Sequence, residues 1–267
     1  MTTTAASVAR DDAFVRDARE RNRRDRLGDQ ARFVYAGWSS VAVAGAISAL
    51  WLHGGPAFTV WKFALFALLY ALVSRVEFEI GNGSAIPTQL VLAPMLFAIP
   101  IGAVPLTVMT GLLLRSPGII RRPAKALPIL SSAAHALGPT LVVALAGGLP
   151  LRWSAWLVYV AALFAQFAFD LGYSVIGGLA NRITARTVIG FLWLIFMVDA
   201  ALAPVGLVLA FAARHHAAFV LLALPLVGLL QYFSRERQHR IDNALELSDA
   251  YRGTAFLLGD VVEADDA

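Results

Sequence analysis

The chain has 267 residues, of which 58% are hydrophobic and only 15% charged, and its formal net charge is +4. Soluble globular domains carry nearer ~25% charged residues, so this composition excludes an ordinary soluble domain. The chain has no cysteine, which excludes disulfides, thiolate chemistry and cysteine-ligated metals.

Residues 1–32 form a polar tail in which arginines and acidic residues are interleaved. A signal peptide has a shorter basic region and a shorter apolar core, so we expect the first apolar segment to be kept as an anchor. Two interpretations of the tail are open. The arginines could bind anionic lipid headgroups, or the acidic residues could weaken that field and leave a solvated, partly helical tail, which we favour.

Eight apolar segments follow, and they predict an all-α fold: a polytopic membrane helical bundle over residues 33–233. A membrane-spanning helix needs about 20 apolar residues, and continuous apolar runs favour helices over the alternating pattern of a barrel. The segments are Phe33–Leu52, Phe58–Ser74, Thr88–Pro100, Ala103–Leu114, Leu127–Ala146, Ala155–Leu179, Val188–Ala212 and Ala217–Phe233.

The third and fourth segments are short and interrupted by prolines, which predicts two short helices or a re-entrant hairpin instead of one span. These prolines are Pro87, Pro94, Pro100 and Pro105. The positive-inside rule also favours a pair that crosses and returns, because only Arg152 and Arg214 are then outside. The cytoplasmic side would carry Arg115, Arg121, Arg122, Lys125, Arg182, Arg186, Arg235, Arg237 and Arg240. Both termini are then expected to be cytoplasmic.

Ionisable side chains inside membranes are expensive and usually face a bundle interior or a water-filled cavity. The candidates for a ligand-binding or sensing site are Lys62, Glu77, Glu79, Asp170 and Asp199. We predict that Asp170 and Asp199 project into a shared interior, with Lys62 or Glu79 as further members. A structural role is the alternative, in which buried carboxyl groups bonded to Tyr, Ser or backbone groups hold the helices together.

Two short stretches echo each other: Phe78–Gly81 and Phe169–Gly172 share the order aromatic, acidic, aliphatic, glycine. An internal repeat of this kind would place a site between two halves, as in transporters with discontinuous helices. The segment Gly81–Gln89, which contains glycines and a proline, is the expected place for non-helical backbone to line a cavity.

The histidines show no metal-ligand spacing, and the sequence has no phosphate-binding glycine loop, nucleophile elbow or nucleic-acid signature. We therefore expect no catalytic residue, no metal, no cofactor and no nucleic-acid partner.

The C-terminal segment Gln231–Ala267 begins at the end of the last apolar segment. A short stretch rich in basic residues comes next, and a charged helix is predicted after it. Seven of its residues recur at the two core positions of a heptad repeat: Ile241, Ala244, Ser248, Tyr251, Ala255, Leu258 and Val262. This seam predicts a coiled-coil-like connector over residues 234–267 through which two copies form a homodimer. A solvated amphipathic tail is the alternative.

Part of this segment, ELSDAYRGTAFLLGDVVEADDA, resembles the connector and opening helix that lead into an HD-GYP-type metal-dependent phosphodiesterase domain of bacterial membrane sensors. In that family a Tyr-Thr-Gly-x-His-Ser segment and metal-binding His and Asp residues follow. The sequence stops at Ala267, so none of those residues can be carried over.

The resemblance implies the membrane input half of a two-part signalling protein in the bacterial inner membrane. Such a half is not itself an enzyme, and it relays a signal to a cyclic-dinucleotide phosphodiesterase domain absent from this chain. A small-solute transporter, with the polar interior as its pathway, is the alternative hypothesis. The sequence does not name a ligand for either function.

Overall fold

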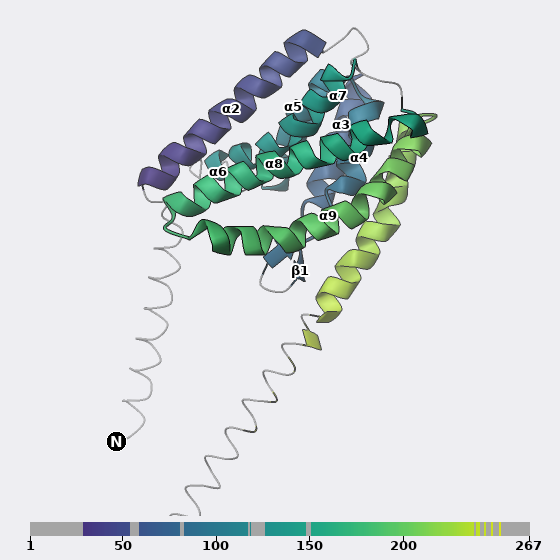
Figure 1. The fold of residues 1–267 in the computed structure, drawn as a ribbon. Helices are drawn as coiled ribbons and strands as arrows, with labels where there is room; N and C mark the ends of the chain where they lie inside the picture. Colours follow the sequence, from purple (N-terminus) through teal and green to yellow (C-terminus); the bar gives the residue numbers. More distant parts are fainter. Residues whose placement is uncertain are drawn as a thin grey trace, which may run out of the picture.

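The computed structural model describes residues 29–53, 59–80, 83–116, 118, 126–147, 151–237, 239–240, 243, 247 and 251. Over these ranges the chain is helical apart from connecting turns and one short hairpin (Figure 1). This agrees with the prediction from continuous apolar runs, because a helix satisfies every backbone polar group within its own segment.

Each of the eight predicted apolar segments is mainly helical over its described residues. The α-helices are α2 (Asp29–His53), α3 (Val60–Val73), α4 (Gln89–Ala98), α5 (Val104–Arg115), α6 (Ala126–Ser132), α7 (Leu137–Leu145), α8 (Trp156–Ala180) and α9 (Ala185–Ala213). Short 3-10 turns adjoin them: η1 (Ile101–Ala103), η4 (Ala133–Ala136), η5 (Trp153–Ala155) and η6 (Ala217–Leu222). The turn η6 opens the last span, Ala217–Arg237. Within the described residues α2 already covers Asp29–Arg32, the last part of the predicted polar tail.

Five helices are long and apolar enough to cross a bilayer. They are Gln30–His53, Ala126–Leu145, Trp153–Ala180, Ala185–Ala213 and Ala217–Arg237. Their outer faces carry large apolar side chains, such as Leu157 and Trp193, which are 63% and 64% exposed. Apolar surface on this scale is unfavourable in water and is typical of helices that face lipid. The helices therefore indicate a membrane protein that crosses the bilayer several times.

The helices α4 and α5 are the short pair that the prolines predict. Their ten and twelve residues rise about 15 and 18 Å, well under the ~30 Å hydrocarbon core. The turn between them packs on the end of α2: a Cβ on Gly102 would lie 2.1 Å from the Ala49 carbonyl oxygen, so only glycine fits. The pair therefore turns at that end of the bundle, and α5 returns to the end of α3, where Arg75 reaches the Leu114 carbonyl oxygen at 3.5 Å.

A two-stranded antiparallel hairpin connects α3 to α4. Its strands are β1 (Phe78–Ile80) and β2 (Gly83–Ala85), with Phe78 opposite Ala85. Non-helical backbone therefore lies where the glycine- and proline-containing segment predicts it. The sequence similarity between Phe78–Gly81 and Phe169–Gly172 does not correspond to a structural repeat. Phe78–Ile80 form a strand, whereas Phe169–Gly172 lie within α8. The internal-repeat hypothesis is wrong at these positions.

The core of the bundle forms where α3, α4 and α5 meet the last span. Phe66, Tyr70, Leu90 and Val220 are completely buried there. The most extensive packing pairs α4 with α9, α7 with α8, and α3 with α5. The α4–α9 pair is held at close range by Gly206, because a Cβ there would lie 2.4 Å from the Gln89 carbonyl oxygen.

The last span leaves the bundle at the end where β1 lies (Figure 1, yellow-green). Ser234 and Arg235, which the sequence assigns to the connector, continue this helix without a break. Tyr251 is also helical and is 68% exposed. The other residues of the predicted seam lie outside the described residues: Ile241, Ala244, Ser248, Ala255, Leu258 and Val262. The coiled coil and the homodimer stay predictions.

Candidate functional site

A buried hydrogen bond joins Tyr70 of α3 to His135 of η4. The Tyr70 hydroxyl lies 2.9 Å from His135 Nε2, and His135 Nδ1 lies 2.6 Å from the Ser132 carbonyl oxygen. A carbonyl oxygen can only accept, so Nδ1 carries a proton; in the neutral imidazole Nε2 then accepts from the Tyr70 hydroxyl. His135 lies in η4, the 3-10 turn between α6 and α7. This turn places its ring within hydrogen-bond distance of the Ser132 carbonyl oxygen, three residues earlier.

Two carboxyl groups lie within electrostatic range of the Tyr70 side chain. Asp170 of α8 and Asp199 of α9 are close enough to interact electrostatically with Tyr70, and Asp170 also interacts with Asp199. Asp199 is only 4% exposed, whereas Asp170 is partly buried. We call Tyr70, His135, Asp170 and Asp199 the polar cluster. The structure thus places Asp170 and Asp199 within electrostatic range of each other, and their role as a ligand-binding or sensing site stays a prediction.

Beside the polar cluster lies a cavity of about 280 Å³ between two helix pairs, α4–α9 and α7–α8. Most of its lining is apolar, with Phe97 from α4, Val143 from α7 and Leu207 from α9. Its polar lining residues are Gln89, Gln166 and Tyr159. A largely apolar pocket with a few fixed polar groups is the usual form of a small-molecule site.

Helix geometry connects the polar cluster to the cavity. Gln166 lies one turn before Asp170 on the same face of α8, and Ala203 lies one turn after Asp199 on α9. The Thr88 side chain interacts with the Tyr70 hydroxyl, and the next residue, Gln89, lines the cavity. A molecule in the cavity would therefore press on the helices that hold the polar cluster.

Two buried polar atoms near this region have no hydrogen-bond partner: Nε2 of Gln89 and Oδ1 of Asp199. Both residues are only 4% exposed. Unpaired buried polar atoms cost free energy, so they are rare in folded proteins and often mark sites where water or a ligand binds. Gln89 lines the cavity, so its amide donor would suit a polar group on an otherwise apolar ligand; Asp199 does not line the cavity but directly precedes Ala200, which does.

The cavity opens sideways between α8 and α9. Trp156 and Val160 at its edge are 57% and 40% exposed, and Ala200 and Pro204 on the facing helix are also exposed. These residues belong to the two helices whose outer faces are apolar enough to meet lipid. A ligand could therefore enter from the bilayer.

The other predicted site residues lie elsewhere. Lys62 stands near the start of α3, about 12 Å along the helix from Tyr70 at 1.5 Å per residue, and forms no ion pair with either aspartate. Glu77 lies beyond the end of α3 and forms an ion pair with Arg115 at the bundle end. Glu79 lies in β1, and its side chain is outside what the structure describes. That Lys62 or Glu79 is a further member of the site stays a prediction.

Sequence reasoning missed Tyr70, His135 and Gln89. In the sequence Tyr70 reads as one more apolar residue in a helix, and His135 as a lone histidine. The signal available was the cost of an imidazole inside an apolar segment, which requires a partner on another helix. The sequence does not say which helix provides it.

The described part of the chain contains no group of three or more His, Cys, Asp or Glu side chains that could hold a metal ion. No family model, curated protein or solved structure matches this chain.

Proposed function

We propose that this chain is a membrane sensor and anchor module whose cavity between α4–α9 and α7–α8 takes up a small, mainly apolar ligand. The observation that carries the proposal is the cavity itself, with the unpartnered Gln89 Nε2 and Asp199 Oδ1 in the same helix pair. A stable bundle gains nothing from leaving these atoms unpaired, so their retention fits a binding role.

The packing of the last span provides a path from the cavity to the end of the chain. Val220, Ala223 and Val227 of the last span belong to the same buried core as Leu92 of α4 and Leu209 of α9. Packed cores respond to a change in volume by shifting whole elements, since they have little free space. Occupancy of the cavity would therefore bias the position of the last span.

The output of the module is the helix that continues from the last span. In this account the seam that includes Tyr251 joins two copies, and the helix carries two alternative arrangements outward to an HD-GYP-like phosphodiesterase domain. A ligand can shift this equilibrium only as far as its affinities for the two arrangements differ.

Disulfide cross-linking in membranes tests the proposal, and the cysteine-free chain makes single-cysteine variants clean. Tyr251→Cys lies on the predicted seam, whereas Asn243→Cys lies on the opposite face of the same heptad pattern. We expect Tyr251→Cys to cross-link and Asn243→Cys to remain monomeric. Ala203→Trp, which fills the cavity, should then change the rate of cross-linking at residue 251.

The matched control is Val208→Trp, which adds the same ring to the exposed face of α9, where Val208 is 57% exposed. It should leave the rate unchanged. Equal cross-linking at residues 243 and 251 would rule out the seam. Equal rates in the two tryptophan variants would rule out the cavity as the input.

A further inference from the structure

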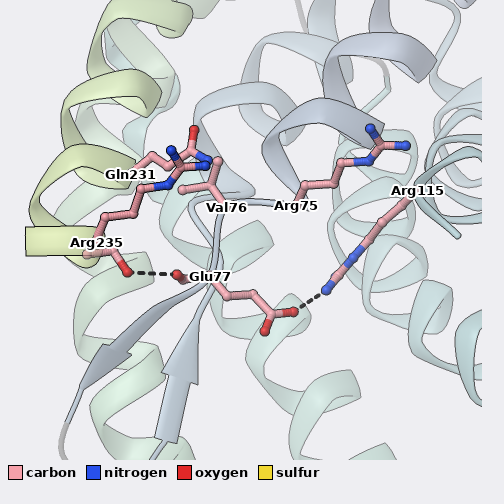
Figure 2. A pocket seen from close by; sticks show the side chains of 7 residues that line it. Arg75, Val76, Glu77, Arg115, Gln231 and Arg235 are labelled. Atoms are coloured by element: carbon pink, nitrogen blue, oxygen red, sulfur yellow. Dashed lines mark hydrogen bonds and ion pairs between the residues drawn. The ribbon is translucent and has the colours of Figure 1, made fainter. Parts of the chain in front are cut away.

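A second pocket lies at the end of the bundle where the last span leaves it. It has a volume of about 510 Å³ and is lined by Arg75, Glu77, Arg115, Gln231, Ser234 and Arg235. These residues come from the ends of α3 and α5 and from the last span. Figure 2 shows the arginines around the opening, with Glu77 between the last span and Arg115. We call this pocket the arginine cleft.

The arginine cleft has an unbalanced positive charge. Its single carboxylate, Glu77, pairs with Arg115. Among the described residues, neither Arg75 nor Arg235 forms an ion pair, and Arg75 only reaches the Leu114 carbonyl oxygen at 3.5 Å. Two guanidinium groups, one from the turn after α3 and one from the last span, therefore line one pocket without an anionic partner among the described residues.

Several guanidinium groups lining one pocket are a typical site for phosphate. Each presents a planar fork of N–H donors that matches phosphate oxygens, and Gln231 and Ser234 place further polar side chains in the same pocket. The arginine cleft also lies at helix ends, on the side that the positive-inside rule predicts to be cytoplasmic, where anionic lipid headgroups concentrate.

We propose that the arginine cleft binds the phosphate group of an anionic ligand, either a phospholipid headgroup or a soluble phosphate, and so ties the last span to the end of α3. The span already has one contact there, from the Ser234 hydroxyl to the Glu77 carbonyl oxygen at 3.0 Å. A phosphate held by Arg75 and Arg235 would add a second link between the same elements. The site is separate from the cavity, and the inference does not depend on what the cavity binds.

The experiment uses the full chain in two kinds of nanodisc. In the lipid arm, nanodiscs contain phosphatidylglycerol and phosphatidylcholine, and native mass spectrometry counts the lipids that stay bound to the released protein. In the soluble arm, nanodiscs contain phosphatidylcholine alone, and inorganic phosphate is added while the unfolding temperature is measured. We compare the wild type with an Arg75→Gln, Arg235→Gln double variant.

The matched control is an Arg182→Gln, Arg186→Gln double variant. It removes the same charge from two exposed arginines of the α8–α9 connection, which lie outside the arginine cleft. The wild type and this control should retain phosphatidylglycerol in preference to phosphatidylcholine. The cleft variant should lose that preference by at least about fivefold, as expected for lost charge-assisted hydrogen bonds.

A lipid preference that depends on Arg75 and Arg235 identifies a headgroup as the ligand. Stabilisation by inorganic phosphate that depends on the same residues identifies a soluble phosphate. The single variant Arg235→Gln, at an exposed residue without an ion pair, serves if the double variant does not fold. Equal losses in the cleft and control variants would show a general basic surface and overturn the proposal, as would the absence of any effect in both arms.

Discussion

The hydroxyl of Tyr70 and the Nε2 atom of His135 are 2.9 Å apart although 65 residues separate them in the sequence. The bond joins the last part of α3 to the 3-10 turn between α6 and α7, where Tyr70 is fully buried and His135 is 9% exposed. It is a polar link between α3 and the segment that leads into α7, one of the helices that line the cavity.

Replacing Tyr70 by Phe should destabilise the protein, because it leaves His135 Nε2 buried without a partner. The expected loss is about 1–2 kcal/mol of unfolding free energy, given the cost of an unpaired buried acceptor and the modest strength of such bonds between membrane helices. Thermal unfolding in detergent measures it. Tyr232→Phe, at a residue that is 63% exposed, is the control and should change nothing. A stable Tyr70→Phe protein would show that the bond does not hold the bundle together.

Asp199 should behave in the opposite way. Its Oδ1 atom has no partner, so neither Asp199→Asn nor Asp199→Leu removes a hydrogen bond at that atom. The asparagine variant replaces an ionisable group with a neutral amide, and the leucine variant removes the buried polar group. We expect the unfolding temperature to stay the same or rise in both variants. A marked fall would mean that Asp199 is structural and would remove the main reason for placing a ligand beside it.

Close packing of α9 on α4 depends on Gly206. Gly206→Ala puts a methyl group 2.4 Å from the Gln89 carbonyl oxygen, so the helices must separate, at a cost of about 1–3 kcal/mol. Gly190→Ala is the control on the same helix, since nothing lies within 4 Å of its added Cβ. That variant should be neutral or stabilising by up to about 1 kcal/mol, because alanine favours helix. Equal unfolding temperatures for the two variants would contradict the tight α4–α9 contact.

The orientation in the membrane follows from charge. Arg75, Arg115 and Arg235 share one bundle end, whereas Arg214 contacts the Leu151 carbonyl oxygen at 3.5 Å elsewhere, beside Arg152. The positive-inside rule predicts that the first group is cytoplasmic. A cysteine at residue 152 should therefore react with an impermeant maleimide in intact cells, and a cysteine at residue 186 only after lysis. The reverse pattern would invert the topology.

The sequence predicted the helices well because apolar length and proline position are local properties. The short pair α4 and α5 follows from Pro94, Pro100 and Pro105, and the non-helical hairpin from the glycines near Gly83. Pairings between distant segments were not predictable. Nothing near Glu77 in the sequence indicates that Arg115 lies beside it, and nothing near Tyr70 indicates His135. The side on which a helix packs depends on all its neighbours at once.

Signalling by the proposed mechanism requires that filling the cavity moves the last span. Spin labels on Leu114→Cys and Leu247→Cys measure it, since these residues are 46% and 58% exposed at the end of α5 and on the helix beyond the last span. Labelled chains are diluted with unlabelled chains in nanodiscs, so that only distances within one chain are recorded by double electron–electron resonance.

We predict that Ala203→Trp shifts or splits the distance distribution, whereas Val208→Trp leaves it as in the wild type. Unfolding temperatures establish that both variants are folded. Superimposable distributions for folded Ala203→Trp and wild-type protein would contradict the account.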